Sequence, residues 1–304
     1  MPMETIDKNT ILSTIFTIVD DALKVPKIAF HLHRFSGPQP DMSDSEVITV
    51  ALYEELIGEP REDHFYRLHA QSLRAYFPKL LERSRYNRRK RDLWKIILAI
   101  RIGFLVLRKA YAEEIGIIDS APVPVIAYKR DKRATDFTSG GYGKCSSKAM
   151  RYFGYKLHTV VTLCGNILDF IVSPASPHDS QAVEELIGAQ ESLLYTLGDK
   201  AYWAPAIMQY LQEQRGIILL ASKKDNQKQT DEEKRFSKQH NTIRLLVETI
   251  NAQLQEQFHL SKHYAKSTWG LMTRIAAKVT MHTLATVINQ LYGRPPLSLA
   301  SLAL

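Results

Sequence analysis

The sequence has very little cysteine and no long apolar run. Its only cysteines, Cys145 and Cys164, do not belong to a C-x-x-C pair, which argues against a disulfide-held scaffold and against a cysteine-rich zinc site. The most apolar stretch, residues 96–107, contains Arg101 and is too short to span a bilayer. The first residues lack the basic start and apolar run of a signal peptide. We therefore expect a cytoplasmic protein with reduced thiols and no membrane partner.

The composition is that of a globular protein with a basic balance. Of the 304 residues, 45% are hydrophobic and 24% are charged, enough apolar material for a buried core. Forty Lys and Arg residues against 32 Asp and Glu residues give a net charge of +8. This excess points mildly toward nucleic acid. No internal repeat or low-complexity tract is present, so the length allows one large domain or two ordinary ones.

The first part of the chain reads as helical, and we expect an all-helical domain over residues 1–110. Ser43 and Glu46 form a plausible capping box that starts a helix over residues 43–57. Helical patterns also cover residues 61–76 and 91–107. Two roles remain open for this domain: a helix-turn-helix-like module that reads DNA ends in the major groove, or a bundle that only packs or dimerises.

The pattern changes near residue 111 to short apolar strands that later alternate with helices. A mixed sheet covered by helices follows from this order, which is the ribonuclease-H-like arrangement; we assign it to a catalytic domain over residues 111–304 that includes C-terminal helices. The predicted strands are 115–118, 155–163, 167–172, 192–197 and 217–221, and the predicted helices are 178–190, 204–214, 236–258 and 269–292.

Three carboxylates lie at informative places in this order. Asp119 ends the first predicted strand, Asp199 ends the fourth, and Glu248 lies on the long helix between apolar neighbours. Strand ends converge at one edge of such a sheet, and hard oxygen ligands suit Mg²⁺. Two such ions can activate an attacking oxygen and stabilise the leaving one at phosphorus. The simpler interpretation is that the aspartates form turns or helix caps and that the glutamate is solvated.

Five motifs, spread over about residues 40–265, resemble those of a known family. The stretches Ile118-Asp119-Ser120, Gly198-Asp199-Lys200-Ala201-Tyr202 and Arg244-x-x-x-Glu248-Thr249 resemble the three catalytic motifs of D-D-E transposases of bacterial insertion sequences. Residues 42–49 and 85–91 resemble the insertion sequence 982 family in particular.

The resemblance implies a DNA transposase that cleaves the ends of a mobile element and joins them to target DNA. It makes Asp119, Asp199 and Glu248 the ligands of two Mg²⁺ ions, for which Mn²⁺ would substitute, and Arg244 a contact to DNA phosphate. The partners it implies are double-stranded DNA, as terminal inverted repeats and target, and a second copy of the chain, since the ends must be brought together.

The chain departs from the family pattern at three positions. Ala201 replaces the usual glycine after Asp-Lys, and Asn241 and Gln255 replace a tyrosine and a lysine. The last two departures put contacts to the transposon end in doubt.

Basic residues gather in two further segments that would neutralise DNA phosphates. For both, a solvated surface is the alternative. Gly143-Lys144-Cys145 lacks the earlier glycine of a nucleotide phosphate loop, so we expect no ATP. With Lys200, the predicted DNA contacts are Arg85, Arg88, Arg89, Lys90 and Arg91 in the first segment and Lys144, Lys148 and Lys156 around the loop at residues 140–143.

Other side chains carry weaker predictions. Tyr202 and Trp203 follow Asp199 and would either stack on an unpaired base or pack the next helix. Asp179 is a helix cap or an extra acidic group near the metals, and residues 269–292 are a candidate interface helix. The histidine pairs at 31/33 and 64/69 lack partners for a metal site.

These features together predict a nucleoid-associated, metal-dependent transposase. Two other functions stay open: a metal-dependent nuclease that cuts without joining, and a DNA-binding protein without catalysis.

Overall fold

The computed structural model describes residues 6–30, 40–145, 149–221 and 231–302, the side chains of 231–241 excepted. The chain forms two compact units, which we describe separately. The helical unit comprises residues 1–104 and 253–304, and the sheet unit comprises residues 105–252. In the part of the chain that the structure describes, no helix is long and apolar enough to cross a membrane.

The helical unit is built around α3, which is buried on nearly all sides. The predicted capping box is confirmed: Ser43 accepts from the Glu46 amide and Glu46 accepts from the Ser43 amide. Gly58 ends α3 in the left-handed region at φ 71°. The helices that belong wholly or largely to this unit are α1 (Lys8–Lys24), α2 (Pro26–Ala29), α3 (Asp44–Ile57), α4 (Glu62–Tyr76), α5 (Arg83–Asp92), α6 (Trp94–Leu107) and α10 (Thr268–Leu291).

The helix predicted over residues 91–107 is confirmed as α6, except that it begins at Trp94 rather than at residue 91. The chain forms α5 and α6 with a break at Leu93, whose ψ of 3° lies outside the helical range. The Leu93 side chain is buried. The basic run therefore belongs to α5, a separate helix whose buried face carries Tyr86 and Lys90.

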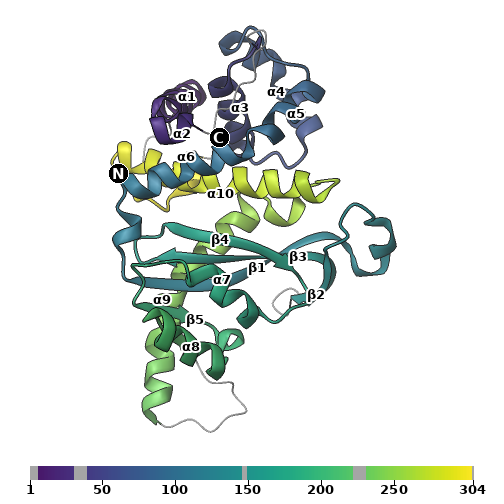
Figure 1. Ribbon diagram of the computed structural model, residues 1–304. Coiled ribbons are helices and arrows are strands. Elements are labelled where there is room, and N and C mark those ends of the chain that lie inside the picture. The colour runs from purple at the N-terminus through teal and green to yellow at the C-terminus, as the bar shows by residue number, and fades with distance from the viewer. Residues whose placement is uncertain (1–5, 31–39, 146–148, 222–230, 303–304) are drawn as a thin grey trace. The chain divides into compact units, whose positions relative to one another are not determined.

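The sheet unit contains one mixed sheet in the strand order β2-β3-β1-β5-β6, with β4 also paired to β3 (Figure 1). β1 pairs with β3 antiparallel and with β5 parallel, and β5 pairs with β6 parallel. This confirms the predicted mixed α/β class and is consistent with a DDE nuclease-like fold. The strands are β1 (Ile115–Ala127), β2 (Gly141–Cys145), β3 (Met150–Thr162), β4 (Ile167–Pro174), β5 (Tyr195–Gly198) and β6 (Ile218–Ala221).

Helices lie on both faces of this sheet. In Figure 1, α7 (Val183–Ile187) lies in front of the strands and α9 (Asp231–Glu256) passes behind them. The core on the first face joins α7 and α8 (Pro205–Arg215) to the strands, and Ile118, Leu186 and Leu211 are among its fully buried members. Side chains alternate along a strand, so the residue after Ile118 points to the other face.

Three predicted segments of this unit differ from the structure. β1 does not end at Ile118 but runs to Ala127, because β3 continues to pair with it beyond the end of β5. The segment at residues 140–143, expected to be a flexible loop, is largely strand β2, paired with β3. The helix predicted over 178–190 is a short 3-10 turn, Asp179–Ala182, followed by the short α7.

Candidate active site

Two of the three predicted carboxylates lie side by side in the sheet unit. β1 and β5 are parallel neighbours with Ile117 opposite Leu197, so Asp119 and Asp199 each lie two residues past that pair. Both residues lie at the same edge of this strand pair, and their side chains point to the same face of the sheet. β5 ends at Gly198, whereas β1 continues past Asp119 in its pairing with β3.

Helix α9 supplies polar partners on that face. The Asn251 side-chain amide donates to Asp119 Oδ2 at 2.9 Å, and only 8% of Asn251 is exposed. Arg244 lies seven residues earlier, two turns along the same stripe of the helix. Its guanidinium also acts on Asp119 electrostatically. Asn251 was not predicted as a site residue from the sequence. The pattern that could have indicated it is a polar residue directly after the apolar Ile250.

Burial and neighbouring charges together set the pKa of the Asp119 carboxyl. Burial raises the pKa of the Asp119 carboxyl to about 6, and the charge of Asp199 acts in the same direction. The charge of Arg244 and the hydrogen bond from Asn251 lower it. Asp199 also caps the turn that follows it, since its Oδ1 accepts from the Ala201 amide at 2.8 Å. The site therefore concentrates negative charge in a partly desolvated place.

Glu248 is less closely held. It lies on the stripe between Arg244 and Asn251, but its side chain is 51% exposed and its nearest ion-pair partner is Arg244 Nη2 at 3.6 Å. Among the described residues, no group of three His, Cys, Asp or Glu side chains is close enough to hold a metal ion. The structure thus brings Asp119 and Asp199 together but does not bring Glu248 into one cluster with them.

The donor atoms present fit a hard divalent cation. Two carboxylates lie at one strand edge, and Asn251 Oδ1 beside them is buried without a hydrogen-bond partner among the described residues. Carboxylate and amide oxygens are the ligands that Mg²⁺ and Ca²⁺ prefer, and neighbouring negative charges favour a cation between them.

Comparison with known proteins agrees with this geometry. A model of the family described as "Transposase DDE domain" matches residues 109–267, about half of the chain. The chain belongs to the DDE transposase family. Searches of curated proteins and of solved structures found no match. Membership supports transposase activity in general, with DNA as partner and a divalent metal as the usual cofactor of the family.

A second group of polar residues in this transposase surrounds Ser120, next to Asp119. Ser120 donates to Asp179 Oδ2 at 2.8 Å, and Lys156 Nζ donates to Asp179 Oδ1 at 2.6 Å and to the Pro177 carbonyl at 2.8 Å. Asp179, predicted as a cap or an extra acid, thus joins β1 to β3 through side chains. The Lys156 side chain is only 17% exposed. Its charge is compensated by the ion pair with Asp179.

The two aromatic residues after Asp199 pack rather than project. Tyr202 is fully buried in the core, and its hydroxyl lies 3.4 Å from His158 Nδ1. Trp203 is partly buried against the same core. In this structure the ring of Tyr202 has no exposed surface on which a base could stack.

The predicted DNA-contact residues of α5 fall into two groups. Arg85 and Arg88 are exposed, whereas Arg89 pairs with Asp44 and Lys90 is buried between Glu54 and Glu62, each at 2.8 Å. Arg91 lies over the ring of Trp269, with its guanidinium carbon 5.7 Å from the centroid.

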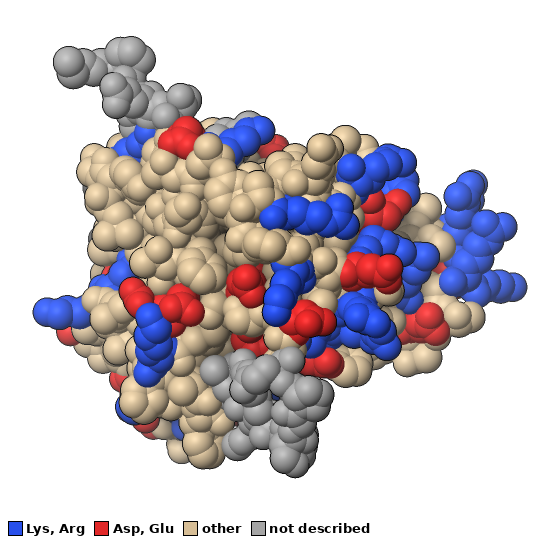
Figure 2. All heavy atoms as spheres, turned by 90° about the horizontal axis from the view of Figure 1, so that it is seen from above, with Lys and Arg blue, Asp and Glu red and all other residues tan. Residues whose placement is uncertain are grey.

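The remaining predicted contacts lie in or near the sheet unit. Lys144 is exposed on β2, Lys200 is half-buried, and Arg244 is largely buried. Lys148 lies outside the described residues. Of the two departures that concern contacts to the transposon end, the side chain of Asn241 is also outside the described residues, and Gln255 accepts a hydrogen bond from Ser261. Figure 2 shows that Lys and Arg gather on one side of the face drawn, several beside Asp and Glu.

Proposed function

We propose that this chain is the transposase of a bacterial insertion sequence, similar to the insertion sequence 982 family, and that it cleaves element ends and joins their 3′-hydroxyls to target DNA. The observation that carries the proposal is the pair Asp119 and Asp199 on neighbouring parallel strands, inside the segment matched by the family model. A ribonuclease-H-like catalytic unit arranges its acidic residues on such strands.

In this proposal Asp119, Asp199 and Glu248 hold two Mg²⁺ ions, with Mn²⁺ as a substitute. The ions, when bound, activate the attacking oxygen and stabilise the leaving one. Glu248 is assigned because it lies on the helical stripe of Arg244 and Asn251, both of which act on Asp119. Asn251 fixes the orientation of the Asp119 carboxylate, as hydrogen-bond donors to metal ligands commonly do.

DNA contacts are assigned first to Arg85, Arg88 and Lys144, whose side chains are exposed. Lys200, next to Asp199, and Arg244, which acts on Asp119, are assigned as well, although Arg244 also pairs with Glu248 at 3.6 Å. Because two element ends must meet, the proposal includes a dimer or higher assembly on DNA. The interface helix predicted over residues 269–292 is α10, and because most of its side chains from Leu271 to Asn289 are buried within its own unit, we do not assign the interface to it. The site of action is the bacterial nucleoid, where the element resides.

The proposal is tested with a plasmid that carries this gene and its native flanking DNA. Purified protein and Mg²⁺ should produce paired cuts at inverted repeats, found by mapping new 3′ ends. Asp119→Asn, Asp199→Asn and Glu248→Gln should each lower the cleavage rate by more than about 100-fold, because even the loss of a hydrogen-bond partner of a metal ligand costs about 10–100-fold. Glu256→Gln, which removes an exposed charge from the same helix, is the matched control and should cleave normally.

The other outcomes separate the alternative functions. Cuts without joining to a target plasmid would indicate a nuclease. DNA binding that is equal in all variants, with no cut in any of them, would indicate a DNA-binding protein. Normal cleavage by Asp119→Asn would overturn the assignment of the site.

A further inference from the structure

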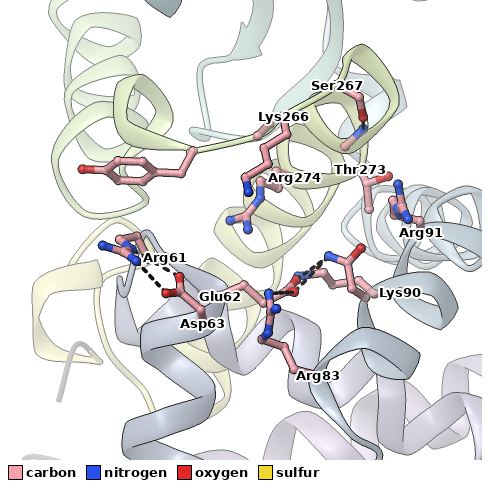
Figure 3. Close-up of a pocket in the computed structure, with 14 residues that line it drawn as sticks. Arg61, Glu62, Asp63, Arg83, Lys90, Arg91, Lys266, Ser267, Thr273 and Arg274 are labelled. Atoms are coloured by element: carbon pink, nitrogen blue, oxygen red, sulfur yellow. Dashed lines mark hydrogen bonds and ion pairs between the residues drawn. The ribbon is translucent and has the colours of Figure 1, made fainter. Parts of the chain in front are cut away.

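A large polar pocket lies within the helical unit. Its volume is about 540 Å³, and its walls come from the start of α4, from α5, from residues 264–267 and from the first turns of α10. Figure 3 shows Lys266 and Arg274 on one side of the space and Arg83 and Lys90 on the other. The pocket has no part in the proposed chemistry at the aspartates, so it needs its own explanation.

The two carboxylates in the wall are already neutralised. Glu62 pairs with Lys90 at 2.8 Å and accepts two hydrogen bonds from the Asn87 amide at 2.9 and 2.8 Å. Burial works to raise the pKa of Glu62, but the Lys90 charge and these hydrogen bonds lower it overall, so Glu62 stays ionised and paired. Asp63 is held by Arg61, with Nη2 at 2.6 Å and Nε at 3.2 Å.

Among the described residues, four cations of the wall have no carboxylate nearer than 4.0 Å, although Glu54, Glu55 and Glu62 act electrostatically on Arg274. Arg83 comes no nearer to Glu62 than 4.0 Å and is 55% exposed on its side chain. Arg274 donates to the Pro60 carbonyl at 3.3 Å, and Arg91 contacts the ring of Trp269. Lys266 is exposed. Within the described ranges, Lys266, Arg91 and Arg274 make no ion pair at all, so the pocket has a net positive charge.

The backbone adds to this charge. The first turn of α10, a helix of 24 residues, lines the pocket through Ser267 and Gly270, and Ser267 caps it by accepting from the Gly270 amide at 3.2 Å. The start of a helix carries a partial positive charge. Arginine guanidinium groups can bind two oxygens of one phosphate through parallel N–H bonds. A tetrahedral oxyanion therefore matches both the charge and the donors of this wall.

We propose that this pocket binds a phosphate group, carried either by a DNA strand or by a small phosphoanion. Glu62 with Lys90 and Asp63 with Arg61 form ion pairs in the wall. The donors for the phosphate are Arg83 on the side of Lys90, Lys266 and Arg274 on the opposite side, and Arg91. The DNA source rests on the proposed function, whereas the pocket itself does not.

The test uses the full chain without divalent metal, in EDTA, so that the aspartates cannot contribute a metal-bound anion. Inorganic pyrophosphate is titrated by calorimetry into the wild type, into the double variant Arg83→Gln/Lys266→Gln, and into the control Lys27→Gln/Lys79→Gln. The control removes two exposed cations from the same unit, and neither lines the pocket. We expect pyrophosphate to bind the wild type and the control equally and the pocket variant at least about tenfold more weakly, as loss of charge-assisted hydrogen bonds predicts.

A second arm identifies the source of the phosphate. Binding of a labelled DNA duplex is followed by anisotropy at several salt concentrations. If DNA supplies the phosphate, the pocket variant loses affinity, its salt slope falls by about 2 because each lost phosphate contact is worth about 1, and pyrophosphate competes with DNA. If a small phosphoanion is the ligand, DNA binding is unchanged while pyrophosphate binding is lost.

Two results would overturn the proposal: no pyrophosphate binding by the wild type, or equal binding by the pocket variant and the control. Thermal melting of each variant verifies folding, and both substituted side chains are exposed. Failure of the proposed function is distinguishable, because Asp199→Asn should bind pyrophosphate like the wild type whether or not the wild type cleaves DNA.

Discussion

Asn251 is a neutral residue of the candidate site that donates a hydrogen bond to Asp119. The donor is its amide nitrogen, the acceptor is the buried carboxylate of Asp119, and its side-chain oxygen has no hydrogen-bond partner in the part of the chain that the structure describes. A neutral donor can orient a carboxylate without competing with a cation for its charge. Asn251 is therefore best understood as a positioning residue for the aspartate pair.

Asn251→Leu should weaken metal binding by about 10–100-fold, the usual cost of losing a hydrogen bond that orients a metal ligand. Mn²⁺ binding followed by electron paramagnetic resonance, in the absence of DNA, measures this without relying on cleavage. Thr249→Val is the control, because the Thr249 hydroxyl is exposed and bonds only to the Leu245 carbonyl. Equal Mn²⁺ affinity in both variants would remove the positioning role.

His158 makes the stability of the sheet unit depend on pH. Burial lowers the pKa of His158 to about 4, while the charge of Asp179 opposes this shift. The unfolded chain takes up a proton near pH 6.5, but the folded chain does so only near pH 4. The contribution of neutral His158 to the free energy of unfolding is thus complete above pH 6.5. It is lost as the pH falls to 4, in total about 3 kcal/mol.

Urea unfolding of the wild type and His158→Gln between pH 7 and pH 4 measures this effect. The variant should be less stable at pH 7, because it loses the bond to Ser173 at 2.8 Å, but its stability should change less across the range. The difference between the two curves isolates His158 from other titrating groups. Parallel curves would show that His158 does not titrate as described.

Among the elements, α5 carries the strongest electrostatic constraint. Its outer face has exposed arginines, while Lys90 on its inner face is 3% exposed and contacts Glu54 of α3 and Glu62 of α4. A second buried pair, Lys278 of α10 with Glu55 of α3, lies in the same unit. Buried charges of this kind set which helix faces meet, because a wrong pairing would leave a charge without a partner.

Lys90→Met should destabilise the protein by about 3–5 kcal/mol, since it leaves two buried carboxylates without their cation. Arg88→Met removes an exposed charge from the same helix and should change the free energy of unfolding by less than about 0.5 kcal/mol. Urea denaturation of both variants makes the comparison. A similar small loss in both would mean that the buried cation contributes little.

At the scale of the whole molecule, the helical unit is not continuous in sequence. Residues 253–304 belong to it together with residues 1–104, and α10 contributes to the pocket beside α5. The functional division into 1–110 and 111–304 stays a prediction. The cations of α5 are also divided between two environments. Arg89 and Lys90 form ion pairs within the unit, whereas Arg85 and Arg88 are exposed.

Local sequence signals predicted a large part of the fold. The capping box at Ser43, the end of α8 at Gly216 in the left-handed region, and the strand before Asp199 all depend on neighbours in the chain. The extension of β1 and the strand β2 were not predictable in this way, because both depend on pairing with β3.

By itself, the sequence determined the identity and order of the acidic residues and the helical or extended character around them, since these follow from residue type and short-range periodicity. Only the tertiary structure decided which of these groups meet. It placed Asp119 beside Asp199 through strand pairing, brought Asn251 to them across the sheet, and enclosed Lys90 while exposing Arg88. The physical reason is that burial and charge pairing depend on partners that are distant in the chain, and no local pattern specifies them.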